Sequence, residues 1–209
     1  MKTGKNDRTE EEMRKNDGFT LVELIVTVAI MTVLIGFVAP SINSLLGFEA
    51  QKATGRVTAA LDNTRVQAMN RLVGEMKLEY KEGQGYYITE YLDLGKDSRK
   101  DSYEQQEEKV ASNKVRIRYK LSDKANPIEM KEESDKSLIL TYNRETGGFR
   151  PVQTSVMLPD EVSESLQKNE DIQFHDGTGY CEWIEIRCGL RTRTIYLKQE
   201  TGGYEVKVN

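Results

Sequence analysis

The sequence contains few of the residues on which many catalytic and metal sites depend. Its 209 residues include one histidine, His175, and two cysteines, Cys181 and Cys188. A single histidine excludes a histidine-rich metal site, and two cysteines are too few for a disulfide scaffold, a C-x-x-C redox pair at this spacing or a four-ligand zinc site. On one extended strand the two thiols would be roughly 23 Å apart, beyond disulfide reach unless the chain turns between them. We therefore expect two separate thiols, free or buried.

Other catalytic patterns are also missing. Cys181 and His175 could serve as nucleophile and base, but nothing marks a third group that would position them, so we interpret His175 as a surface residue beside a turn. The many carboxylates cluster in polar stretches, which is typical of a solvated face rather than of a paired acid and base. Gly83-Gln84-Gly85 lacks the later glycine and the following helix of a phosphate loop. We predict no enzymatic activity, no cofactor and no metal site.

The charge balance favours an exposed, soluble domain. Charged residues make up 31% of the chain, and the formal net charge is -4. An acidic balance disfavours non-specific binding to nucleic acid or to anionic lipid, although local basic patches are still allowed.

One long apolar run, Phe19–Ala39, stands directly before Pro40 and contains a single charged residue, Glu23. As a helix this run would be roughly 31 Å long, about the thickness of a hydrocarbon core. No small-x-small cleavage site follows it and no cysteine lies near it, which argues against a cleaved signal peptide and against a lipoprotein anchor. We predict one membrane span, with the basic residues Arg14 and Lys15 keeping the preceding leader in the cytoplasm.

Glu23 is unusual because a carboxylate inside a membrane span costs about 2.5–3.5 kcal/mol on insertion scales. If the chain were cut between Gly18 and Phe19, the new α-amine of a neighbouring copy could neutralise this carboxylate. Alternatively, Glu23 lies close to the head groups, where an acid in the first turn suits the helix dipole. The residues alone leave both interpretations open.

The stretch Gly18-Phe19-Thr20-Leu21-Val22-Glu23 resembles the prepilin motif of type IV pilins and of the pseudopilins of type II secretion. That motif has a short polar leader ending in glycine, an aromatic residue, an acid at the fifth mature position and proline at the twenty-second, which is Pro40 here. The resemblance implies cleavage after Gly18, N-methylation of Phe19, and assembly through Phe19, Glu23 and Pro40. The leader departs from the family because its side-chain charges cancel, whereas family leaders tend to be basic.

Beyond Pro40, apolar residues recur at three- and four-residue steps from Ala50 to Leu72. We predict one helix from about Thr20 to about Leu72, with a kink or loosening at Pro40. Its outer half would place an apolar stripe on a sheet. The predicted division is a leader at 1–18, a transmembrane and assembly helix at 19–40, its amphipathic continuation at 41–73, and an extracellular β-rich domain at 74–209.

The alternating pattern downstream predicts antiparallel strands. We expect them near residues 76–80, 86–91, 115–121, 137–143, 172–174, 181–188, 192–198 and 203–208. The polar stretches 96–114, 122–136 and 151–170 are predicted as loops, and the glycine pairs at 147–148 and 202–203 as hairpin turns. The expected class is α+β and pilin-like, a long helix packed on an antiparallel sheet. A looser resemblance to H-type pseudopilins and minor pilins covers Leu61-x3-Arg65-x2-Ala68-Met69 and the C-terminal strands.

Two functional classes follow. The first is a structural filament subunit whose partners are other pilin or pseudopilin subunits, prepilin peptidase, an inner-membrane assembly platform protein and membrane lipid. It would be a single-pass protein of the cytoplasmic membrane with its C-terminal domain outside, and later part of a cell-surface or periplasm-spanning filament. The second is a minor pilin at a filament tip whose sheet or loops bind DNA, a surface or a secreted substrate. A basic stripe, Arg116, Arg118 and Lys120, is its candidate ligand contact. The sequence does not distinguish secretion, twitching, DNA uptake and adhesion.

Overall fold

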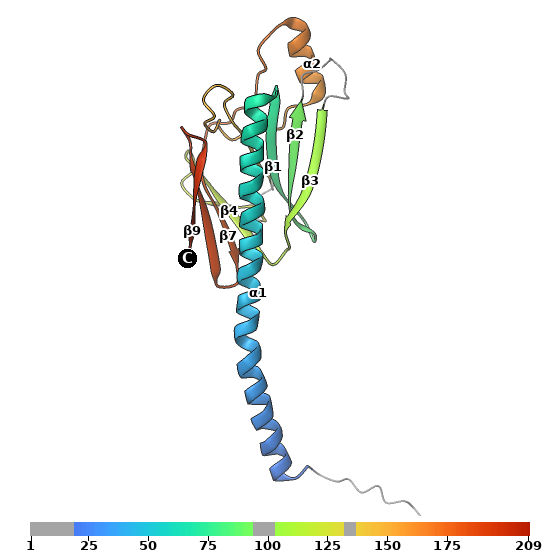
Figure 1. Ribbon diagram of the computed structural model, residues 1–209, viewed down its shortest axis with the longest axis vertical. Coiled ribbons are helices and arrows are strands. Elements are labelled where there is room, and N and C mark those ends of the chain that lie inside the picture. The colour runs from blue at the N-terminus through green and yellow to red at the C-terminus, as the bar shows by residue number, and fades with distance from the viewer. Residues whose placement is uncertain (1–18, 94–102, 132–136) are drawn as a thin grey trace, which may run out of the picture. The chain divides into compact units, whose positions relative to one another are not determined.

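The computed structural model describes residues 19–93, 103–131 and 137–209, with the backbone alone for 37–46 and 103–104. Its fold is α+β, with a long N-terminal helix, antiparallel strands and one short helix (Figure 1). The chain divides into two compact units between Ser41 and Ile42. Gly18 and the rest of the predicted leader lie outside the described residues.

The long helix α1 spans Leu21–Asn70, within two residues of the predicted bounds, and it continues through Pro40. In the part of α1 that belongs to the first unit, the Thr27 and Thr32 hydroxyls donate to carbonyls three residues earlier, at 2.9 and 2.8 Å. These bonds satisfy the hydroxyls locally, as expected for helical threonines. Among the described residues, no helix is long and apolar enough to cross a membrane, so the expected span is not found there.

The strands form two antiparallel sheets within Ile42–Asn209. The first sheet has the order β3-β2-β1-β6 and contains β1 Val73–Lys81, β2 Gly85–Asp93, β3 Tyr103–Ala111 and β6 Ser137–Thr141. The second has the order β5-β4-β7-β8-β9 and contains β4 Arg116–Leu121, β5 Ile128–Glu129, β7 Cys181–Cys188, β8 Arg191–Lys198 and β9 Gly203–Val208. The stretch Gly83-Gln84-Gly85 forms the turn of the β1–β2 hairpin, and Gly83 and Gly85 both adopt positive φ angles.

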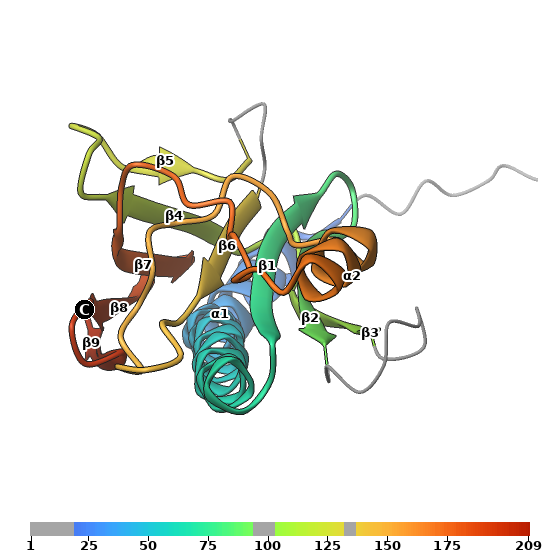
Figure 2. The ribbon, with the colours of Figure 1, turned by 90° about the horizontal axis from the view of Figure 1, so that it is seen from above.

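The outer part of α1 lies between the two sheets when the domain is seen from above (Figure 2). Its predicted apolar stripe is confirmed, since Ala53, Val57 and Leu61 are fully buried in one core with residues of both sheets. The Tyr142 hydroxyl donates to the Leu61 carbonyl at 3.1 Å, which ties β6 to the helix. Burial of this stripe explains why the amphipathic pattern specifies the helix so clearly.

The prediction of a loop over 96–114 is wrong, because β3 occupies most of its described part. This strand is an edge strand whose charged side chains remain in solvent while Val110 and Ala111 are buried. Its glutamates form ion pairs across the sheet and to α1, for example Glu108 with Arg56 at 3.0 Å. Edge strands carry charge routinely, so a polar composition alone does not exclude one.

The prediction for 151–174 is also wrong in two places. The expected loop contains helix α2, Pro159–Lys168, which begins with a proline at its first turn and acidic residues beside it. These are ordinary helix-start signals. The expected strand at Ile172–Phe174 forms no ladder. Ile172 and Phe174 instead cover a small second core of Val73, Met157 and Val162.

The two glycine-pair turns have different outcomes. The turn before Gly203 joins β8 and β9, so the predicted hairpin is confirmed. The turn before Phe149 closes on a single bridge to Tyr142, so a full hairpin there is wrong. The short strand β5 interrupts the loop predicted over 122–136. Both cysteines are free and buried, as expected.

Candidate functional site

The start of α1 is closed by a reciprocal pair of hydrogen bonds between Thr20 and Glu23. The Glu23 backbone N–H donates to the Thr20 hydroxyl oxygen at 3.2 Å, and the Thr20 backbone N–H donates to the Glu23 carboxylate at 3.3 Å. This arrangement is a capping box, which satisfies two backbone donors that a helix start leaves open. The Thr20-x-x-Glu23 spacing is its sequence signal, and our sequence interpretation missed it.

The capping box gives Glu23 a role within its own helix. Both contacts with Thr20 use the same carboxylate oxygen, Oε2. An acid at this position also interacts favourably with the helix dipole. Because Thr20 is fixed by these contacts, the preceding residue, Phe19, is placed immediately outside the capped helix, with 80% of its surface exposed. A carboxylate therefore lies one helical turn from the predicted cleavage point.

The first part of α1 has an apolar surface with no cover from the described chain. Every residue from Phe19 to Gly36 is exposed. One side has a shallow hollow of about 350 Å³, lined by Val26, Ala29, Ile30, Val33 and Leu34. Such a surface requires lipid or another apolar helix to remove it from water. Pro40 lies within α1, and its side chain is outside the described atoms.

Residues 13–39 match the model of the prokaryotic N-terminal methylation motif. The chain carries the prepilin-type signature of type IV pilins and pseudopilins. This signature points to a pilin-like subunit that is processed by prepilin peptidase and assembles with other such subunits, rather than to an enzyme. It also indicates a membrane-anchored protein at the cell surface. No curated protein and no solved structure matches the chain significantly.

The basic stripe predicted on residues 116–120 lies on β4, but its members do not form a free cationic surface. Arg118 donates twice to one Glu185 oxygen, from Nε at 2.9 Å and from Nη2 at 2.5 Å. The Lys120 ammonium donates to the Leu121 carbonyl at 3.0 Å. Arg116 differs, because 68% of its side chain is exposed and its Glu129 contact is 3.9 Å long.

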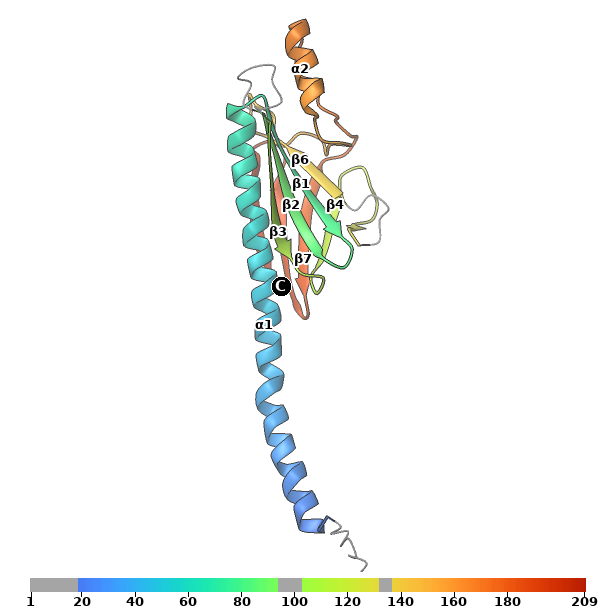
Figure 3. The ribbon, with the colours of Figure 1, turned by 90° about the vertical axis from the view of Figure 1, so that its right-hand side faces the viewer.

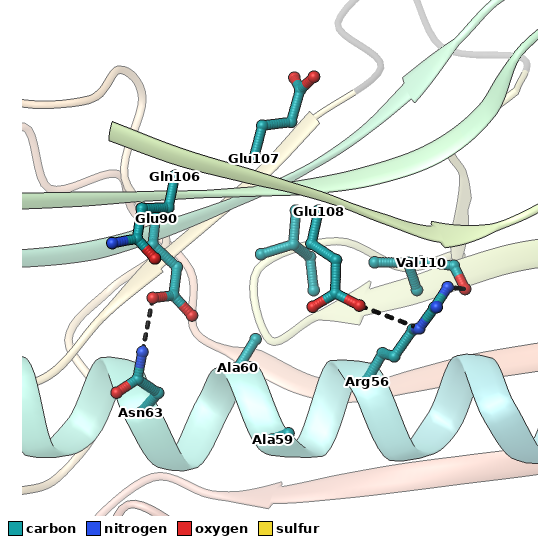
Figure 4. A pocket seen from close by; sticks show the side chains of 10 residues that line it. Arg56, Ala59, Ala60, Asn63, Glu90, Gln106, Glu107, Glu108 and Val110 are labelled. Atoms are coloured by element: carbon teal, nitrogen blue, oxygen red, sulfur yellow. Dashed lines mark hydrogen bonds and ion pairs between the residues drawn. The ribbon is translucent and has the colours of Figure 1, made fainter. Parts of the chain in front are cut away.

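A groove of about 340 Å³ lies between α1 and the strands β2 and β3. Figure 4 shows Arg56 and Asn63 of α1 facing Glu108 and Glu90, while Glu107 points away from the helix. Asn63 donates to Glu90 at 2.6 Å, and Arg56 also donates to the Val110 carbonyl at 3.3 Å. Burial raises the pKa of Glu90, and the Asn63 amide opposes that rise. The polar groups of this groove therefore bind one another and hold β3 against the helix.

His175 contacts Ser155 and Glu161, and the imagined pair with Cys181 is not formed. Its Nδ1 lies 2.6 Å from the Ser155 hydroxyl, and its Nε2 lies 3.4 Å from Glu161. The second Glu161 oxygen accepts the Leu158 backbone N–H at 2.8 Å, at the start of α2. The three side chains thus fasten α2 to the following loop. Cys181 is buried, which raises the pKa of its thiol.

Glu75 on β1 is the least expected of the polar residues. It is fully buried, and its Oε2 accepts the Met157 backbone N–H at 2.8 Å, just before α2. No hydrogen-bond partner is described for Oε1. Burial raises the pKa of Glu75 to about 7 from an ordinary 4.5. The alternating pattern of β1 gave no sign that this acid would be inside.

Proposed function

We propose that the chain is a pseudopilin or minor pilin, a structural subunit of a type IV pilus-like or type II secretion-like filament. The observation that carries this proposal is the methylation motif at residues 13–39, with an exposed Phe19 beside a capped helix. In this proposal prepilin peptidase cuts between Gly18 and Phe19 and methylates the new amine. The exposed apolar surface of α1 anchors the subunit in the cytoplasmic membrane until the assembly platform protein extracts it.

The filament forms when the N-terminal helices of different subunits pack together. Small and β-branched residues on α1, such as Ala29 and Val33, allow helices to approach closely in lipid. The Phe19 amine of one subunit pairs with Glu23 of a neighbour, since both charges would otherwise stay unpaired in apolar surroundings. Pairing in this way sets the axial register. Oε1, the Glu23 oxygen that the capping box does not use, can accept the amine while the capping box is retained.

The test separates the two roles of Glu23. Glu23→Gln keeps an oxygen that can accept the Thr20 N–H but removes the charge, whereas Glu23→Ala removes both. Mass spectrometry of the mature N-terminus should show methylated Phe19 in the wild type and in both variants. Filament incorporation should fall as strongly in Glu23→Gln as in Glu23→Ala. Normal incorporation of Glu23→Gln would remove the register role and leave only the helix cap.

Thr20→Ser serves as the matched control, because serine keeps the hydroxyl of the capping box. This variant should be processed and incorporated like the wild type. A product that begins at Met1, or downstream of the apolar run, would contradict the proposed function itself.

A filament-tip module that binds DNA is the second candidate, and fewer observations support it than support the structural subunit. Arg118 and Lys120 bind groups of their own domain, which leaves Arg116 as the exposed member of the predicted stripe. A gel-shift titration at two salt concentrations would reveal such binding. If it occurs, Arg116→Gln should weaken it more than Lys198→Gln, an exposed lysine on β8.

A further inference from the structure

Two arginines lie directly opposite each other on neighbouring strands of the second sheet. Arg116 of β4 is in register with Arg187 of β7, and both side chains are exposed. Their neighbours Ile117 and Ile186 pair next to them and are fully buried. The two cations therefore share the outer face. Like charges directly opposite on a sheet are destabilising, so this pair lowers stability unless an anion binds it.

The β7–β8 turn adds an apolar tip at the end of this sheet, with Arg191 on the opposite face from Arg187, in register with the buried Cys188. Leu190 is 77% exposed, and Gly189 before it adopts a positive φ of 59°, which glycine tolerates in a tight turn. Arg191 follows Leu190, and Lys114 lies close by because its carbonyl accepts the Cys188 thiol at 3.8 Å. We name these residues the Leu190 patch: Phe48, Lys114, Arg116, Arg187, Leu190 and Arg191.

The patch lies at the end of the domain where α1 enters it. A Cβ at Gly47 would lie 3.3 Å from Cγ of Arg191, so the turn contacts the helix there. Phe48, the next residue of α1, is 62% exposed. Figures 1 and 3 both show the β7–β8 turn beside α1 at this end of the sheet. All members of the patch belong to the unit Ile42–Asn209.

The distance along the chain from the proposed anchor is short. If the anchor ends at Ala39, Gly47 follows eight residues later, so the chain keeps it within at most about 28 Å of the anchor. A head-group layer is about 5–8 Å thick on each side of the hydrocarbon core. Arginine and lysine side chains add to this reach, because their long aliphatic stems extend the charge toward the interface.

We propose that the Leu190 patch docks the extracellular domain onto anionic head groups in the outer leaflet of the cytoplasmic membrane. This docking would occur before the subunit is extracted from that membrane into the filament. This inference rests on the proposed membrane anchoring. Clustered cations bind anionic lipid electrostatically, and an exposed leucine adds apolar contact at the boundary with the acyl chains. The combination favours lipid, because the acyl chains next to the head groups give the exposed leucine an apolar contact. Two acids lie beside the patch and offset part of its positive charge: Glu129, 3.9 Å from Arg116, and Glu49, whose charge acts on Cys188.

The experiment uses the full-length chain reconstituted into vesicles. An environment-sensitive fluorophore is attached to Leu190→Cys, and the buried native thiols compete little because burial raises the pKa of both. The emission should shift to the blue in vesicles that contain phosphatidylglycerol, and brominated lipid should quench it. Both effects should be lost in phosphatidylcholine alone, in high salt, and in Arg116→Gln/Arg187→Gln.

Two controls make the outcomes distinct. The same label on Glu145→Cys, exposed in a turn that packs near the far end of α1, should stay in water in every vesicle. The double variant Arg144→Gln/Lys198→Gln removes equal charge elsewhere and should behave like the wild type. If alkaline carbonate extracts the chain from the vesicles, the proposed membrane anchoring is wrong. If the chain is retained but the label at position 190 reports water, the docking proposal is wrong and the anchoring stands. The same holds if the label responds to duplex DNA and not to anionic lipid.

Discussion

Replacing Glu75 by glutamine should remove the part of the pH dependence of the unfolding free energy that comes from titration of the Glu75 carboxyl. The carboxyl group is fully buried, and burial raises its pKa to about 7 from 4.5, against the lowering effect of the Met157 N–H. Glu161 and Asp176 raise the pKa further, and Arg150 lowers it. A raised pKa means that the folded protein holds this proton more tightly than the unfolded chain does. The resulting stability is fully present below pH 4.5 and is lost as the pH rises through about 7.

The magnitude follows from the size of the shift. A rise from 4.5 to about 7 corresponds to about 3 kcal/mol, at about 1.4 kcal/mol per pKa unit. Glutamine resembles the protonated acid in shape, and its amide oxygen can still accept the Met157 N–H at the position of Oε2. The variant therefore retains the low-pH contacts at every pH. Its advantage over the wild type should grow by about 2.5 kcal/mol from about pH 5 to about pH 8.

The assay is urea denaturation of the full chain in detergent, followed by the fluorescence of the only tryptophan, Trp183 on β7. The matched control is Glu182→Gln, which changes an exposed glutamate on the same strand and should keep the wild-type pH dependence. Parallel pH profiles of the wild type and Glu75→Gln would refute the reasoning. The Glu75 carboxyl would then titrate at its ordinary pKa, and its burial in the folded state would be wrong.

Three further predictions concern the packing of the domain. Leu61→Ala should lower the free energy of unfolding by about 2–5 kcal/mol, measured by the same denaturation, because the side chain is fully buried between the sheets. Gly74→Ala should also destabilise the fold, since a Cβ there would collide with the Ala68 backbone; unchanged stability would contradict the tight α1–β1 connection. Cys181 and Cys188 should react with a thiol reagent much more slowly in the folded protein than in urea, and equal rates would contradict their burial.

Much of the fold could be predicted from the sequence because one-sided burial leaves a periodic record. The steps of Ala53, Val57 and Leu61 follow the helix period, and all three meet the core. The strands β4 and β7 alternate in the same way, with Ile117 and Ile186 inside. The prepilin signature required no periodicity at all, because it depends on the identity and spacing of a few residues.

The errors occurred where burial is small or comes from elsewhere in the chain. β3 pairs through its backbone and keeps most of its glutamates in solvent, so its composition resembles that of a loop. α2 buries Val162 alone, and its packing depends on Val73 and Met157 from distant segments. Glu75 could not be recognised as buried, because its contact comes from Met157, which is 82 residues away along the chain in the segment before α2.

The exposed Arg116–Arg187 pair and the buried Glu75 carboxylate both lower the stability of this domain, and we infer different reasons for them. Sequences tend to break local rules where function requires it. The Arg116–Arg187 pair is exposed and lies beside an apolar tip, so an external anion can remove its cost. Glu75 has no such route, because it is fully buried and its cost depends only on pH and on its own neighbours. If the docking proposal is correct, Arg116→Gln/Arg187→Gln should stabilise the isolated subunit in detergent while it weakens lipid contact. Glu75→Gln should stabilise the subunit at high pH and leave lipid contact unchanged. The two variants therefore separate charge repulsion that is retained for lipid binding from charge burial that affects only the core.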